Sequence, residues 1–99
     1  AIQKYVESNG FSVIREMVGH GIGKDMHEDP AVPNYGYKNF GEKIENGLVI
    51  AIEPMVNMGR KEIVIKEDGW TCVTRDGKPS CHYENTVAII NDKVEILTI

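Results

Sequence analysis

The pattern of apolar and polar positions predicts one short helix at the start of the chain, then a strand and a long loop. Apolar residues recur at helical spacing within residues 1–10. Residues 11–18 alternate loosely, which predicts a strand running into the glycine-rich segment 19–23. Residues 24–40 are rich in Gly, Pro, Asn and Asp, so we expect a loop there.

The second half of the chain has the pattern of β structure. Leu48 to Ile52 is an uninterrupted apolar run, which is typical of a strand covered on both faces. Four later segments favour strands: 63–65, 70–74, 83–90 and 94–99. The turn-forming pairs among them are Asp68-Gly69, Asp76-Gly77 and Asn91-Asp92. This order of elements predicts a single α+β domain over residues 1–99.

Composition and charge exclude several classes of protein. With 41% hydrophobic and 26% charged residues, the composition is that of a globular domain. The net charge of -4, from 11 Lys+Arg and 15 Asp+Glu, argues against a nucleic-acid or anionic-membrane partner. No apolar run reaches the roughly 20 residues that span a bilayer. Cys72 and Cys81 are too few for a disulfide scaffold or a zinc-thiolate cluster, so we expect reduced thiols in a cytoplasmic protein.

The first candidate for chemistry is His20, which stands among the three glycines of residues 19–23. Glycine lets a backbone approach a ligand closely and leaves the imidazole uncrowded. A second histidine, His27, follows in the predicted loop and can point at the same space. A lone histidine is more often packed or solvated than functional, so the residues alone leave both interpretations open.

Two glutamates stand beside apolar strands. Glu53 closes the run that ends at Ile52, and a carboxylate there is costly to bury unless a metal, an arginine or a proton compensates. Glu84 stands among the β-branched and apolar residues of 83–90. The alternatives are a solvated strand end for Glu53 and an edge-strand charge for Glu84.

Together, one histidine and two glutamates form an N/O ligand set. Such a set suits divalent Mn, Fe, Co or Zn. The spacings are wide, so three strands must converge for these side chains to meet. A cysteine hydrolase that uses Cys81 with His82 is geometrically poor, because adjacent residues of a strand point to opposite faces.

Five motifs occur in a fixed order along the chain: Gly19 to Gly23, His27 to Pro30, Ile52 to Met55, Asp68 to Thr71, and Ser80 to Thr86. The ordered set resembles type I methionine aminopeptidases over essentially the whole chain. The short stretch between His27 and Glu53 leaves no room for the helical insertion of the type II enzymes. Prolidase and aminopeptidase P share the Gly-His-Gly element and both glutamates. However, Ile-Glu-Pro-Met and Asp-Gly-Trp look more like the methionine-specific branch.

The resemblance implies a role for each matched residue. His20 and Glu53 would bind one metal, Glu53 would also handle the proton of the attacking water, and Glu84 would bridge two metals. His27 would hydrogen-bond the scissile amide, and Trp70 would line the pocket for the substrate's methionine side chain. The cofactors would be two divalent ions of Co, Mn, Fe or Zn, which generate the attacking nucleophile and stabilise the tetrahedral intermediate.

Three positions depart from the family pattern. Met26 stands where a larger side chain is frequent, His82 where glutamine is common, and Asn85 where histidine is frequent. Met26 and His82 adjoin the implied substrate pocket, so the side-chain preference can differ from that of the family. None of the three departures removes a metal ligand.

The resemblance also implies that part of the family's fold lies outside these residues. The pita-bread (creatinase/aminopeptidase) fold has two α/β halves, and two aspartate ligands belong to the N-terminal half. We expect this chain to be the C-terminal half, a curved and mostly antiparallel sheet with a helix on one face. The chain alone is then expected to be inactive and to self-associate through exposed sheet surface. The alternatives are a non-catalytic pita-bread binding module or an aminopeptidase P/prolidase-like peptidase.

Overall fold

The computed structural model describes all residues from 1 to 99. Its single helix is α1 (Ile2–Ser8), as the sequence predicts. The strands are β1 (Ser12–Val13), β2 (Gly19–Gly21), β3 (Glu28–Val32), β4 (Val49–Ile52), β5 (Met55–Asn57), β6 (Ile63–Ile65), β7 (Cys72–Thr74), β8 (Ser80–His82), β9 (Asn85–Ile90) and β10 (Lys93–Ile96). No helix is long and apolar enough to cross a membrane.

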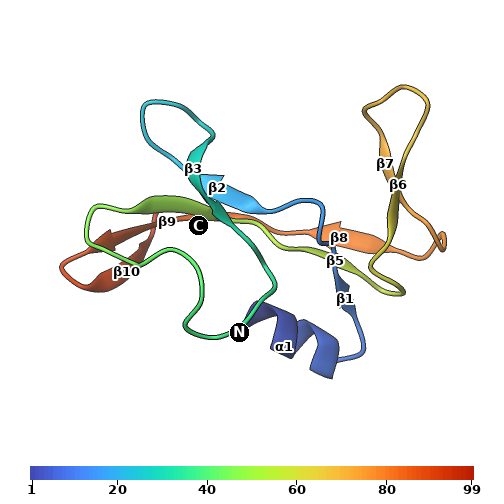
Figure 1. The fold of residues 1–99 in the computed structure, drawn as a ribbon, viewed down its shortest axis with the longest axis horizontal. Coiled ribbons are helices and arrows are strands. Elements are labelled where there is room, and N and C mark those ends of the chain that lie inside the picture. The colour runs from blue at the N-terminus through green and yellow to red at the C-terminus, as the bar shows by residue number, and fades with distance from the viewer.

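The strands form two sheets and a separate hairpin, and all pairings are antiparallel. The larger sheet has the order β10-β9-β4-β2-β3, the smaller one has the order β1-β5-β8, and β6 pairs with β7. Figure 1 shows that β4 leads into β5 and β8 into β9, so that the two sheets form one long curved surface. Helix α1 lies on the opposite side of this surface from the β2–β3 and β6–β7 hairpins. The α+β expectation is confirmed.

The predicted loop over residues 24–40 is wrong in part, because it contains strand β3. The strand was not predicted because Pro30 lacks a backbone N–H and because the residues at the start of the strand are acidic. Both are tolerated because β3 is the edge of the five-stranded sheet, where one side needs no hydrogen-bonded partner.

The predicted strand over residues 11–18 is also wrong in part, because only two of these residues are in a strand. The chain forms strand β1 at Ser12–Val13, leaves strand geometry, and forms β2 only at Gly19–Gly21. The reason is a change of partner: β1 pairs with β5 in the smaller sheet, whereas β2 pairs with β4 in the larger one. The expected strand over 83–90 likewise begins only at Asn85, after a separate strand β8.

The core is small, with 11 of the 99 residues buried. It centres on β4 and β9, the middle strands of the larger sheet. Ile50 and Ala51 are neighbours on β4 and are both buried, so the strand is covered on both faces there, as its apolar run predicts. Elsewhere the sheets stay thinly covered, and many large apolar side chains are exposed.

The three predicted turns are present. Asn91 and Asp92 have φ of 51° and 61°, the left-handed values of a tight two-residue hairpin turn between β9 and β10. Asn46 stabilises this turn through two hydrogen bonds. Its side-chain N–H donates to Oδ1 of Asp92 at 3.0 Å, and its side-chain oxygen accepts from the backbone N–H of Asp92 at 2.7 Å. Gly69 and Gly77 adopt positive φ in the other two turns.

Candidate metal centre

Residues 53–54 separate β4 from β5, and residues 83–84 separate β8 from β9. The two interruptions lie opposite one another in the pairing. Ile52 pairs with Asn85 before the break and Met55 pairs with His82 after it, so the register is unchanged across the two missing pairs. The Tyr83 backbone N–H still donates to the Pro54 carbonyl at 3.3 Å within the break. This register puts Glu53 directly opposite Glu84. Two carboxylates that are far apart in sequence therefore become cross-strand neighbours.

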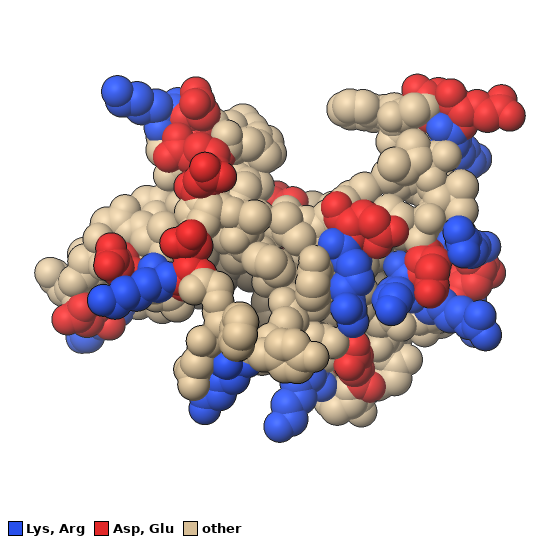
Figure 2. All heavy atoms as spheres, viewed as in Figure 1, with Lys and Arg blue, Asp and Glu red and all other residues tan.

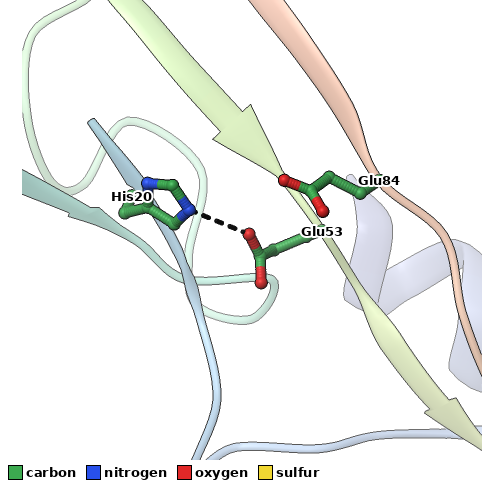
Figure 3. A group of neighbouring side chains, drawn as sticks. All are labelled: His20, Glu53 and Glu84. Carbon is green, nitrogen blue, oxygen red and sulfur yellow. Dashed lines mark ion pairs between the residues drawn. The ribbon is translucent and has the colours of Figure 1, made fainter. Parts of the chain in front are cut away.

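His20 reaches the same place from strand β2, where it pairs with Ala51 of β4, two residues before Glu53. Its Nε2 lies 3.1 Å from Oε2 of Glu53, and its Nδ1 lies 3.0 Å from the Gly21 carbonyl oxygen. Figure 3 shows the imidazole and both carboxylates turned toward a common point. The side chains of His20 and Glu53 are only 14% and 15% exposed, while Glu84 is more open.

The glycines on either side of His20 allow the neighbouring strands to pack closely. A Cβ atom at Gly19 would overlap the Ala51 carbonyl oxygen, and one at Gly21 would overlap the Asp29 carbonyl oxygen. The two glycines therefore let β2 lie close between β3 and β4. They thereby fix the depth at which the sheet holds His20, and the expectation that they let a ligand approach stays a prediction.

The chain's other two histidines lie beside this trio. The ring of His27 is 4.0 Å from the ring of His20 between centroids, at an interplanar angle of 36°. Nε2 of His82 lies 3.9 Å from Oε1 of Glu53, and its side chain is 42% exposed. All three histidines of the chain thus gather at one centre.

The remaining two predicted site residues, Met26 and Trp70, stand on projecting segments. Met26 lies in the turn between β2 and β3 and is 74% exposed, while Trp70 lies in the turn between β6 and β7 and is 87% exposed. Figure 1 shows both hairpins projecting on the same side of the sheet, and Figure 2 shows the surface hollowed between them. Neither side chain is enclosed, so their predicted role in a substrate pocket stays a prediction.

The donor atoms of His20, Glu53 and Glu84 are spaced to suit a divalent ion. One donor atom from each of His20, Glu53 and Glu84 lies within 4.8 Å of the others. Ligand atoms about 2.1 Å from a common ion lie roughly 3 to 4 Å apart, so small side-chain movements close this set around a metal. One nitrogen and two carboxylate oxygens suit Zn, Fe, Mn or Co, and three protein ligands are typical of a catalytic site with open positions.

The comparison with protein families agrees with this centre. Residues 1–91 match the metallopeptidase family M24, so the chain belongs to that family. Members of a metallopeptidase family are hydrolases that use metal, in accord with the convergence of an imidazole and two carboxylates here.

Within that family, the chain is similar to methionine aminopeptidases. It is 61% identical over 98 residues to the methionine aminopeptidase of Clostridium perfringens and 53% identical over 98 residues to methionine aminopeptidase 1 of Bacillus subtilis. These matches cover 99% of this chain but only 39% and 40% of the relatives. The chain thus spans about two fifths of their length.

The solved structures give the same result for the fold. The chain matches a methionine aminopeptidase of Thermotoga maritima with a TM-score of 0.93 at 52% identity, covering 97% of this chain and 39% of that one. It matches a methionine aminopeptidase of Rickettsia prowazekii with a TM-score of 0.94 at 38% identity, covering 98% and 40%. The resemblance to this group, and the pita-bread type of fold that it implies, are confirmed.

Sequence reasoning found all three residues that converge, but it missed the contact of His82 with Glu53. A signal for it was present, because His82 and Glu84 are two residues apart and residues at that spacing in an extended chain point to the same side. The same alternation turns Cys81 to the other side, which agrees with the rejection of a Cys81–His82 hydrolase.

Proposed function

We propose that this chain forms part of a metal-dependent aminopeptidase that releases the initiator methionine from newly made proteins in the cytoplasm. The observation that carries the proposal is the meeting of His20, Glu53 and Glu84 in a chain that closely resembles methionine aminopeptidases. A purely structural set of charges is a poor alternative, because two carboxylates placed directly opposite one another repel unless a cation lies between them.

Each of these residues has its own role in the proposed peptide hydrolysis. His20 and Glu53 would hold one divalent ion and Glu84 would be shared with a second, and the ions would be Co, Mn, Fe or Zn. When bound, the ions polarise the scissile carbonyl and acidify the attacking water. Glu53 takes the proton of that water as the water oxygen bonds to the carbonyl carbon. It returns the proton to the leaving amine when the peptide C–N bond breaks.

His27 is placed to act on the substrate and not on the metal. Its ring lies against that of His20, so it borders the ligands. We assign it a hydrogen bond to the scissile amide, where an N–H donor stabilises charge that develops in the transition state. Met26 and Trp70 would surround the methionine side chain of the peptide, and an aromatic ring makes favourable contact with a thioether.

Two further carboxylate ligands would come from an N-terminal half of the same enzyme. With three ligands in place of five, we expect the 99-residue chain to hold metal weakly and to release little or no methionine on its own.

The test is methionine release from a Met-Ala-Ser peptide with Mn(II) or Co(II), comparing this chain with a longer protein that carries the N-terminal half. We expect no turnover by the chain alone, turnover by the longer protein, and loss of that turnover in Glu84→Gln. Cys81→Ser is the matched control, since Cys81 is exposed and lies on the same strand segment.

The outcomes separate the alternatives. Metal binding and peptide binding without any turnover by the longer protein would indicate a non-catalytic binding module. A preference for Xaa-Pro peptides over Met-Ala-Ser would indicate an aminopeptidase P-like or prolidase-like enzyme. Turnover by the 99 residues alone would contradict the need for the two additional carboxylates.

A further inference from the structure

The carboxylate of Glu53 lies between two imidazoles, one at each oxygen. Oε2 faces Nε2 of His20 at 3.1 Å, and Oε1 faces Nε2 of His82 at 3.9 Å. Since His20 and Oε2 lie on the side of Glu84, the oxygen that turns toward His82 is the one directed away from the ligand set.

The backbone places His82 for this contact. His82 is the last residue of strand β8 and pairs with Met55 of strand β5, which lies two residues after Glu53. Backbone pairing continues beside it, because the N–H of Tyr83 donates to the Pro54 carbonyl. His82 is therefore held by the sheet and not by a flexible loop, while its half-open imidazole keeps the freedom to rotate toward Oε1.

We propose that His82 is a positioning residue that donates its Nε2–H to Oε1 of Glu53 and so keeps Oε2 directed at the metal. This inference rests on the proposed function, in which Glu53 is both a ligand and the group that handles the proton. Each carboxylate oxygen has its own lone pairs, so Oε1 accepts the N–H of His82 while the lone pairs of Oε2 stay free on the side of the ligand set. Outer partners of this kind orient ligating carboxylates and affect metal affinity.

This role differs from the substrate contact that the sequence suggests for His82. A substrate contact predicts that changes at position 82 alter KM and leave metal binding intact. Direct ligation predicts that every side chain without a ring nitrogen weakens metal binding to the same extent. A donor to Glu53 predicts instead that glutamine, which carries an N–H₂ group, replaces histidine, whereas leucine does not.

The first experiment needs no metal. In the ¹⁵N-labelled metal-free chain at about pH 8.5, where an ordinary histidine is neutral, we expect an observable Nε2 proton on His82 that is slowed in exchange with water. We expect Glu53→Ala to shift this signal and speed its exchange. A proton found on Nδ1 of His82, or a signal indifferent to Glu53→Ala, would overturn the proposal.

The second experiment is a Co(II) titration followed by visible absorption, performed on this chain and on the variants His82→Gln, His82→Leu and Cys81→Ser. We expect His82→Leu to weaken Co(II) binding by about 10- to 100-fold, the range for lost outer partners of a ligand. His82→Gln should stay within about 3-fold of the parent chain, and Cys81→Ser should be unchanged. Circular dichroism of each variant checks that the sheet is retained.

Equal weakening in His82→Gln and His82→Leu would overturn the proposal in favour of direct ligation. Full affinity in His82→Leu would overturn it in favour of a substrate contact. If the parent chain and the longer protein bind no Co(II), the proposed function fails, and the proton on His82 still decides whether the contact with Glu53 exists. Failure of the positioning role and failure of the metal centre are thus distinguishable.

Discussion

Glu53 and Glu84 stand opposite one another across an interruption in two antiparallel strands whose register is the same on both sides, with Ile52 against Asn85 and Met55 against His82. Like charges in this arrangement destabilise a sheet. The third side chain at the break is His20, whose nitrogen completes a set of donors for a cation. The break in the strands therefore places two like charges opposite one another and brings together the donors that we propose as metal ligands.

Replacing Glu84 with glutamine should have opposite effects with and without metal. Without metal, removing one of two opposed carboxylates should raise the free energy of unfolding by about 0.5 kcal/mol, the size of a cross-strand charge effect. With Co(II) present, the parent chain should gain stability as its ion binds, by about 2.7 kcal/mol at 100 times the dissociation constant. Thermal unfolding of both proteins, with and without Co(II), measures both effects. A variant that gains as much from Co(II) as the parent would exclude Glu84 as a ligand.

Replacing Gly19 or Gly21 with alanine should disrupt the centre without touching a ligand. The added Cβ meets a backbone carbonyl oxygen in each case, and overpacking of this kind typically costs about 1–3 kcal/mol. Because β2 must move away from its neighbours, His20 moves too, and Co(II) affinity should fall. Urea unfolding and Co(II) titration measure the two losses.

Gly10→Ala is the control for the glycine variants. Gly10 has a φ of 83°, but nothing lies within 4 Å of an added Cβ. It should cost about 1 kcal/mol of backbone strain and leave Co(II) affinity unchanged. Equal losses of affinity in Gly10→Ala and Gly19→Ala would contradict the packing explanation.

Acid should loosen the base of the β6–β7 hairpin through Asp76. Hydrogen bonds from the backbone N–H groups of Arg60 and Lys78 hold the pKa of Asp76 below its usual 3.8. A group whose pKa is lower in the folded state adds stability above the unfolded value of 3.8. That stability is lost as pH falls through the folded pKa. We therefore expect the β6–β7 region to lose order below about pH 4.

The acid prediction is measured by following the amide signals of Arg60 and Lys78 during an NMR titration. In Asp76→Ala these signals should lose their acid transition, because the acceptor is gone. Asp68 is the internal comparison: the Thr71 hydroxyl and the backbone N–H groups of Thr71 and Trp70 lower the pKa of its carboxyl. Its own acid transition should persist in Asp76→Ala. A transition of Arg60 and Lys78 that survives the substitution would assign it to another group.

The isolated chain should self-associate through the β9–β10 hairpin. Strand β10 is an edge of the larger sheet, and Val94 and Ile96 on it are 64% and 58% exposed. Exposed apolar edge strands pair readily with other chains. Val94→Lys should lower the association measured by sedimentation velocity. Val64→Lys on β6 is the control, an exposed valine on a different hairpin, and should not. A monomeric parent chain at about 100 μM, above the micromolar range where exposed edges begin to associate, would contradict the prediction.

The sequence by itself determined which residues are candidates for the site and most of the local structure. Glu53 and Glu84 were conspicuous because a carboxylate beside a strand needs either solvent or a counter-charge. The helix, the run before Glu53 and the turns at Asp68-Gly69 and Asn91-Asp92 were predictable because spacing and turn chemistry act over a few neighbours. These predictions therefore depended only on residues that are close together in the sequence.

Only the tertiary structure decided which strands exist at the edges and where the long strands break. Strand β3 forms despite Pro30 because one of its sides faces no partner. Residues 14–18 fail to continue β1 because the next pairing belongs to another sheet. Strand β1 pairs with residues 56–57 and β2 with residues 50–51, so no window of local sequence contains both partners.

The tertiary structure also determines that the side chains of the site come together. The register places Glu53 against Glu84, and the glycines beside His20 set how deeply its strand packs. The contact of His82 with Glu53 depends on that same register. The sequence therefore identified the candidate ligands but not their meeting, because distances between strands are fixed by hydrogen-bond register and close packing over the whole sheet.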